Sequence, residues 1–340
     1  MKRKPVSLQD IADACGVSLM TVSRAVHGKF GVSPDVQRKV VSCAEEMGYI
    51  PSRDLYLLSD AKPTMTIGFV IPHLADTIFP AMFEAIESFF AERGWRVMMC
   101  CSHNSTISEY RVISSLLQLG VDGLLWCPVA TDGYTHLREL LTQSHKPLVF
   151  VDRRVPDFAA DAVTVDDRAA MQRLVEHVLA RGAKRIAYLG AASDSSWTAR
   201  ERKAGFLAAL SAARLTPDET LIRNVGSDIA SGVRGAAELL DAAKCPDAIC
   251  CYNDPLALGV EKELRARKVR IPKDCLLTGF SDTLMTELAA VPITTARQDA
   301  TALGREAARL LYRRLVSKPP KSPLFKVIPT TLTIRTSTTT

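Results

Sequence analysis

Basic side chains that could attract a polyanion are concentrated at the beginning of the chain. Residues 1–40 contain seven basic and three acidic residues, a net charge of +4, whereas the whole chain of 340 residues carries only +6. The basic residues are Lys2, Arg3, Lys4, Arg24, Lys29, Arg38 and Lys39. Such a local excess is typical of a DNA-binding segment, because lysine and arginine neutralise phosphates. On charge alone, a solvated basic tail is the alternative.

The residue types that carry enzymatic or metal chemistry do not occur with a suitable spacing. The sequence contains none of the patterns G-x-x-x-x-G-K-[ST], G-x-S-x-G and H-E-x-x-H, and its six histidines are dispersed. Its nine cysteines form no C-x-x-C pair, and the adjacent cysteines at 100–101 and 250–251 would point to opposite faces of a strand. We therefore expect no enzyme activity, no metal and no cofactor.

The same cysteine usage bears on the compartment, because scattered free thiols indicate a reducing environment. The first ten residues, MKRKPVSLQD, lack the apolar stretch of a signal peptide. No window approaches the roughly 18 uninterrupted apolar residues of a membrane span. The expectation is a cytoplasmic protein that has no membrane partner.

Three short helices are predicted within the first fifty residues, over 8–15, 19–26 and 34–47. Each begins after a serine that can cap it: Ser7, Ser18 and Ser33. Ala12, Gly16 and Val22 have the spacing that a helix-turn-helix requires. They supply a small residue where the helices cross, a glycine in the turn and an aliphatic residue that holds the second helix. The alternative is a small helical bundle that packs on the next domain.

This segment resembles the DNA-binding head of the LacI/GalR family of bacterial transcription regulators. The resemblance rests on VSLQDIADACGVSLMTVSRAVHG at 6–28, followed by GVSP at 31–34 and EMGYIP at 46–51. In that family the second helix lies in the major groove of DNA. The resemblance assigns base-reading positions to Leu19, Met20 and Arg24, and positions near phosphates to Thr21, Ser23 and His27.

The residue types suit these implied roles. Arg24 can make a bidentate contact to guanine O6 and N7, whereas Leu19 and Met20 offer only apolar contacts, for instance to thymine methyl groups. For Thr21 and Ser23 the alternative is an ordinary hydroxyl on the helix surface.

Residues 50–62 resemble the hinge of the same family, a segment too short to be a stable helix alone. In the family the hinge folds when two copies meet on DNA, and a leucine from each copy enters the minor groove. Alignment from Pro51 places that leucine at Leu58. Leu55 and Tyr56 replace the usual small and basic residues, as in the branch that contains gluconate repressors, so which leucine enters the groove stays open. The alternative is a linker packed on the large domain.

Strand-like and helix-like segments alternate over residues 63–340. Apolar runs of strand composition lie at 66–71, 96–100, 123–127, 148–151, 185–189, 248–251 and 276–280. Amphipathic segments between them include 81–93, 170–181, 202–213, 232–243 and 257–267. This alternation predicts an α/β fold of doubly wound parallel sheets. About 280 residues exceed one such sheet, so we expect two lobes with a ligand cleft at the carboxyl ends of their strands.

The family resemblance continues through this domain in TIGFVIP at 66–72, GVDGLL at 120–125, RIAYLG at 185–190 and YNDPLALG at 252–259. It implies the fold of class I periplasmic sugar-binding proteins and a small sugar-like effector. By position, the resemblance assigns effector contacts to Phe79, Asp152, Arg202, Asn253 and Asp254.

One departure from the family bears on the charge of the effector. The family's usual aspartate after Gly-Phe is Ser281 here, so the cleft loses an anion while it keeps Arg202, with Arg153 and Arg154 nearby. This favours a sugar acid or a phosphorylated sugar over a neutral sugar. A solvated loop is the alternative for Arg153 and Arg154, and Trp197 would either stack on a ligand or anchor a loop.

The resemblance as a whole implies an allosteric transcription regulator, expected to be a repressor that binds a double-stranded DNA operator as a homodimer. It divides the chain into a helix-turn-helix domain at 1–49, a hinge at 50–62 and an effector-binding and dimerisation domain at 63–340. The C-terminal tail contains no leucine heptad of the kind that builds tetramers in this family. Two alternatives remain, a solute-binding receptor of the same fold and a regulator controlled mainly by a protein partner.

Overall fold

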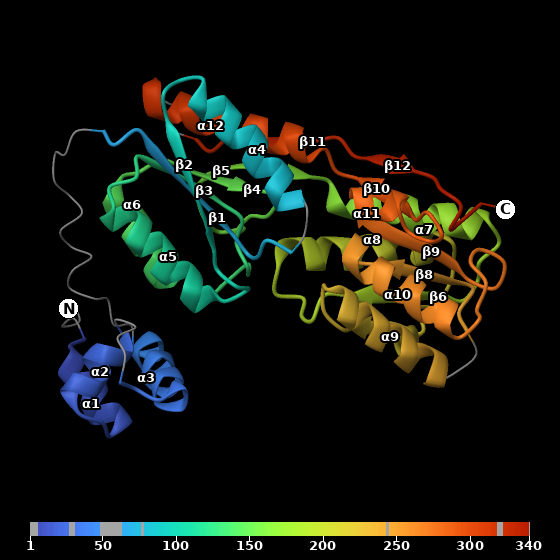
Figure 1. Cartoon of the computed structure of the whole chain (residues 1–340), viewed down its shortest axis with the longest axis horizontal. Coiled ribbons are helices and arrows are strands. Elements are labelled where there is room, and N and C mark those ends of the chain that lie inside the picture. Colours follow the sequence, from blue (N-terminus) through green and yellow to red (C-terminus); the bar gives the residue numbers. More distant parts are fainter. Residues whose placement is uncertain are drawn as a thin grey trace. The chain divides into compact units, whose positions relative to one another are not determined.

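The computed structural model describes residues 6–26, 31–47, 63–75, 78–242, 245–317 and 322–339 (Figure 1). His27 and the predicted hinge, including Leu58, lie outside these ranges. The chain forms a head (residues 6–47) and a large domain (residues 63–133 and 146–339). Within the described residues, no helix combines the length and the apolar character that a membrane crossing needs.

The head consists of three helices, α1 (Leu8–Cys15), α2 (Leu19–Val26) and α3 (Pro34–Glu46), which confirms the predicted order. The predicted capping box is present, since the Ser7 backbone N–H donates to Asp10 Oδ2 at 2.7 Å and Ser7 Oγ accepts from the Asp10 N–H at 3.3 Å. Gly16 ends α1 with a φ of 66°, in the left-handed region that favours glycine. The buried core of the head consists of Ile11, Ala12, Cys15, Val22, Ala25, Val40 and Ala44.

The first lobe of the large domain contains a six-stranded, all-parallel sheet in the order β11-β5-β4-β3-β1-β2. Its strands are β1 (Thr66–Ile71), β2 (Arg96–Cys101), β3 (Gly123–Trp126), β4 (Leu148–Val151), β5 (Asp161–Val165) and β11 (Phe325–Ile328). Figure 1 shows α4 (Ile78–Ala91) and α12 (Ala300–Val316) together on one face, and α5 (Thr106–Gln118) on the other. A further helix, α6 (Thr135–Ser144), follows β3 in the chain.

The second lobe contains a six-stranded sheet in the order β12-β10-β9-β8-β6-β7, parallel except for the antiparallel edge strand β12. Its strands are β6 (Ile186–Gly190), β7 (Ile222–Asn224), β8 (Ala248–Cys251), β9 (Leu276–Ser281), β10 (Thr294–Arg297) and β12 (Thr331–Thr333). Helix α7 (Asp167–Ala180) packs against α8 (Trp197–Ala212), and α9 (Ile229–Ala242) packs against α10 (Asp254–Ala266). Two short elements complete the lobe, a 3₁₀ turn at Glu219–Leu221 and α11 (Leu284–Glu287).

Each lobe has its own hydrophobic core, one over β1, β4 and α12 and the other over β6, β8 and α10. Paired helices approach closely at glycines in both lobes. A Cβ on Gly304 of α12 would lie 2.5 Å from Met82 O, and a Cβ on Gly205 of α8 would lie 2.2 Å from Arg168 O. Alanine at either position would therefore push its helix pair apart. The two predicted lobes and the α/β class are confirmed.

The chain passes between the lobes three times, after β5, after β10 and after β11. These three crossings give the lobes several covalent connections beside the predicted cleft. A residue on one of these crossings can contact side chains of both lobes.

The predicted helices of the large domain begin three to five residues too late. The apolar pattern predicts starts at 81, 170, 202, 232 and 257, whereas the helices begin at 78, 167, 197, 229 and 254. For α7, α8 and α10 the reason is that polar residues cap the helix ahead of its apolar pattern, which therefore gives no signal for the start. Asp166, Ser196 and Asn253 each accept a hydrogen bond from a backbone N–H three residues later.

Candidate functional site

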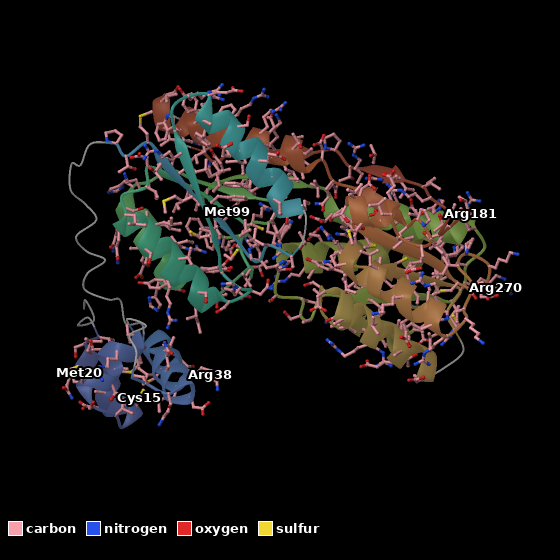
Figure 2. The ribbon with its side chains drawn as sticks, in the orientation of Figure 1. Cys15, Met20, Arg38, Met99, Arg181 and Arg270 are labelled. Atoms are coloured by element: carbon pink, nitrogen blue, oxygen red, sulfur yellow. The ribbon has the colours of Figure 1, made fainter. Side chains whose placement is uncertain are left out.

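The outer face of α2 presents the side chains that were predicted to read DNA bases. Leu19 and Met20 are 48% and 63% exposed, and Arg24 is exposed, whereas Val22 and Ala25 are buried in the head. Figure 2 shows Met20 at the surface of the head. Two adjacent apolar side chains beside a guanidinium offer both kinds of contact that base edges in the major groove present, methyl groups and hydrogen-bond acceptors.

The neighbouring hydroxyl residues have local roles as well. Thr21 Oγ1 and Ser18 Oγ are 2.8 Å apart, and the Thr21 N–H donates to Ser18 Oγ at 3.1 Å, so this pair caps α2. Ser23 is half-buried. Gly31 lies beside the Arg24 guanidinium, where a Cβ would come 3.2 Å from Nη1, and its φ of 100° suits glycine. Gly31 therefore leaves room for the Arg24 side chain.

A cavity of about 230 Å³ lies between the lobes at the carboxyl ends of their strands. Asp152 follows β4, Ala191 follows β6, Tyr252 follows β8 and Gln298 follows β10. Six of the seven residues predicted to contact an effector line this cavity: Phe79, Asp152, Arg153, Arg202, Asn253 and Ser281. The protein therefore has a cavity at the place where folds of this class bind their ligands.

Arg202 of α8 is held in place from several sides. Its Nε donates to Asp167 Oδ1 at 2.8 Å, and its Nη1 donates to the Tyr252 carbonyl at 2.8 Å. The guanidinium also lies 3.7 Å from the centroid of the Phe280 ring, within the range of cation–π attraction. Burial raises the pKa of Asp167 to about 7, against the opposing effect of the Arg202 charge.

A second group of contacts joins the lobes through Gln298, on the crossing after β10. Gln298 Nε2 donates to Asp152 Oδ1 at 3.3 Å, and Gln298 Oε1 accepts from Ser281 Oγ at 2.9 Å and from Arg202 Nη2 at 3.4 Å. Asp152 has a φ of 65° and Ser281 a φ of 124°, conformations that L-residues seldom adopt. The end of β4, the end of β9 and α8 thus meet at one amide.

Asn253 and Asp254 are neighbours in the sequence but have different surroundings. Asn253 lines the cavity, caps α10 through its Oδ1 and donates from Nδ2 to the Ser227 carbonyl at 2.9 Å. Asp254 is fully buried and does not line the cavity. Its carboxylate accepts from the Thr283 N–H at 2.7 Å and from Thr295 Oγ1 at 2.8 Å. Asp254 therefore lies inside the second lobe and not on the wall of the cavity.

Two further candidates from the sequence, Arg154 and Trp197, also lie outside this cavity and contact each other instead. The sequence pattern did not indicate two residues that support this cavity: Gln298, which lines it, and Asp167, which lies outside it and holds Arg202. Asp167 is the second residue of an Asp-Asp pair before a helix, which was a usable signal. Gln298 follows a strand of polar composition that the apolar pattern did not identify.

Two family models match the chain. "Bacterial regulatory proteins, lacI family" covers residues 7–52, and "Periplasmic binding protein-like domain" covers residues 175–338. The "HTH-type transcriptional regulator DegA" of Bacillus subtilis (strain 168) is 30% identical over 335 residues, which are 98% of each chain.

The solved structures that resemble the whole chain include two that were determined with bound ligands. The "transcriptional regulator CelR-cellobiose complex" has a TM-score of 0.75 and 28% identity, and covers 98% of this chain and 99% of its own. The lac repressor dimer bound to operator and the anti-inducer ONPF has a TM-score of 0.73 and 26% identity, with coverage of 98% and 99%. The chain belongs to the lacI family of bacterial regulatory proteins and is a DNA-binding transcriptional regulator, not an enzyme.

Proposed function

We propose that this regulator is a repressor that binds a near-palindromic operator as a homodimer, and that a small neutral sugar in the interlobe cavity controls its DNA affinity. The observation that carries the effector class is the pairing of charges around the cavity. Each of its two guanidinium groups faces a carboxylate, Arg202 at 2.8 Å from Asp167 and Arg153 at 3.6 Å from Asp152.

This pairing changes the expectation drawn from the sequence. From the sequence, a sugar acid or a phosphosugar is the expectation, because Ser281 replaces an aspartate while Arg202 is kept, with Arg153 and Arg154 nearby. With both guanidiniums next to carboxylates, an added anion would meet carboxylates as well as cations. A neutral ligand rich in hydroxyl groups avoids that repulsion and can exchange hydrogen bonds with both charge types.

The size of the cavity supports a small sugar. At about 230 Å³ it is smaller than the roughly 300–1,000 Å³ of pockets that hold drug-sized ligands, so one sugar ring fits better than two. The related regulator CelR, solved as a complex with cellobiose, supports the general class of ligand. Phe79 and Tyr252 line the cavity and supply the apolar faces on which a sugar ring can pack.

A thermal-shift series of matched ligands tests this effector class. Glucose would be compared with gluconate and glucose 6-phosphate, and galactose with galactonate, each at equal concentration. A ligand that binds only the folded state stabilises it by RT ln(1 + [L]/Kd), about 2.7 kcal/mol at a hundredfold excess over Kd. We expect a neutral sugar to raise the melting temperature more than its acid; a shift produced by the acids alone would contradict the proposal.

For DNA recognition we propose that Leu19, Met20 and Arg24 of α2 contact base edges, with Thr21 and Ser23 near phosphates. His27 and Leu58 keep their proposed roles beside a phosphate and in the minor groove, although both lie outside the described residues.

Two copies of the regulator would read two half-sites, because operator symmetry mirrors the symmetry of a dimer. Acting on DNA, the regulator would work in the cytoplasm at the nucleoid. Selection of binding sites from random DNA should return an inverted repeat.

We further propose that effector and operator are coupled through the lobes. Gln298 lies on one crossing between the lobes and Asp167 directly after another, so a ligand that engages their partners favours one lobe arrangement. By linkage, ligand and operator must change each other's affinity by the same factor, commonly about 5–150-fold. Ligand titrations with and without the selected operator measure that factor from both directions.

A further inference from the structure

A second hollow, of about 340 Å³, lies between the lobes and shares no lining residue with the effector cavity. The first lobe contributes Arg154 and the edge strand β11, and the second contributes Trp197 and Glu201 of α8. We call it the aromatic hollow; its lining consists of Arg154, Ala162, Thr164, Val165, Asp166, Asp167, Trp197, Glu201, Phe325 and Val327.

Aromatic rings from both lobes already hold a cation there. The Arg154 guanidinium lies 4.3 Å from the centroid of the Trp197 ring and 5.3 Å from that of Phe325. Both distances are within cation–π range. Phe325 and Val327 are exposed on the outer side of β11, so the ring of Phe325 is open to a ligand from solvent. Within the described ranges, no ion pair holds Arg154 in addition to these rings.

The charge on the walls is predominantly negative. Asp166 and Glu201 line the hollow against the single positive charge of Arg154, and the third carboxyl group, that of Asp167, is paired with Arg202 behind the wall. Asp167 is buried, and its Oδ2 atom accepts no hydrogen bond from the residues that the structure describes. A buried carboxylate oxygen without a donor is costly, and a ligand that brings a cation or an N–H donor would satisfy it.

We propose that the aromatic hollow is a second ligand site, which takes a small organic cation with an apolar or aromatic body. The ligand replaces the Arg154 guanidinium between Trp197 and Phe325, and its positive charge faces Asp166 and Glu201. An organic cation gains more than Arg154 does, because it also buries apolar surface against Val327 and the two rings. The site is independent of the sugar proposed for the effector cavity.

Calorimetric titration of the full chain with benzyltrimethylammonium tests this site, with benzyl alcohol and benzoate as neutral and anionic probes of similar shape. We expect the cation to bind at millimolar concentration or below, the alcohol to bind more weakly and benzoate not to bind. Phe325→Ala and Trp197→Leu should each weaken cation binding by about 5–10-fold. Phe325 is exposed, so its substitution tests the site without threatening the fold.

Arg154→Ala gives the sharpest result. It removes the internal competitor and one positive charge, so it should strengthen cation binding by about two- to fivefold. Arg200→Ala is the matched control, because it removes the same charge from α8 outside the hollow, and it should leave the affinity unchanged. Absence of cation binding, tighter binding of benzoate, or weaker cation binding by Arg154→Ala would each overturn the proposal.

Discussion

The Arg202 guanidinium donates to Asp167 at 2.8 Å and so connects a residue that lines the effector cavity with one that lines the aromatic hollow. Neither side chain is more than 4% exposed. A buried ion pair contributes little net stability when it is complete, but it costs much when one partner is lost, because the other charge stays buried alone. The pair therefore acts as structural support for both sites.

Arg202→Ala should accordingly lower the free energy of unfolding, by up to about 3–5 kcal/mol above pH 7, where Asp167 is left as an unpaired buried charge. The double substitution Arg202→Ala with Asp167→Asn should cost less than the single one, because the amide carries no unpaired charge. Urea denaturation of the wild type, both single variants and the double variant gives the coupling energy. If the double variant is as unstable as the sum of the singles, the two side chains do not form the pair described.

Asp167 should also make stability depend on pH. Burial raises its pKa from 3.8 to about 7, with Arg202 opposing the shift. A raised pKa means that the folded state holds the proton more tightly, so this contribution is complete below about pH 4 and is lost as the pH rises to about 7. The unfolding free energy of the wild type minus that of Asp167→Asn should therefore fall between these pH values and level off above them.

Urea titrations at a series of pH values measure this difference. Asp132→Asn, which changes an exposed carboxylate, is the matched control. If the unfolding free energy of the wild type minus that of Asp167→Asn rises with pH, the pKa of Asp167 is set by the Arg202 charge and not by burial.

The head could be predicted from sequence because its signals are local. A capping serine such as Ser7, a turn glycine such as Gly16 and the apolar spacing around Val22 act within one or two helical turns. No distant part of the chain is needed to place them. The exposed face of α2 can then be predicted, because the helix positions that are not buried in the core must face outward.

The effector cavity was only partly predictable. Asp152 and Asn253 follow apolar strands, and that position alone brought them to the cavity. Asp254 is the next residue, but its hydrogen bonds to Thr283 and Thr295 turn it into the second lobe. Such partners lie some 30–40 residues away in sequence, and no periodic pattern reveals them. Gln298 was missed for a related reason, because its role depends on three side chains from separate elements.

Arg24→Ala should weaken binding to the selected operator by about 1–3 kcal/mol per half-site and relax the preference for guanine at one position. The physical reason is the loss of a bidentate contact to a base edge. Arg38→Ala is the control, since it removes an exposed arginine of the head that pairs with Asp35 on α3. It should weaken binding equally for all sequences, by an effect on phosphate attraction. Fluorescence anisotropy at fixed salt with operators varied at single positions distinguishes the two results, and equal behaviour of both variants would refute the assigned role of Arg24.

Leu288→Asp should convert a dimer into a monomer. Leu284, Met285 and Leu288 form an exposed apolar patch in and just after α11, and such patches mark contact surfaces. Leu119→Asp is the matched control. Leu119 is about as exposed as Leu288, 63% against 69%, but Leu119 lies at the end of α5 and not at α11. Sedimentation at micromolar concentration should show a dimer for the wild type and the control. If Leu288→Asp is still a dimer, the dimer interface does not lie at α11.

Ser337→Ala should destabilise the second lobe, because the C-terminal tail is part of its sheet. Ser337 is fully buried; its Oγ donates to the Leu277 carbonyl at 2.6 Å and accepts from the Thr294 N–H at 2.8 Å. The alanine leaves the Thr294 N–H without that acceptor in a buried place, which costs about 1–3 kcal/mol. Thr336→Ala, one residue earlier and exposed, is the control and should cost little. Urea midpoints of the two variants measure the contrast, and equal midpoints would mean that the tail contributes to the lobe through its backbone alone.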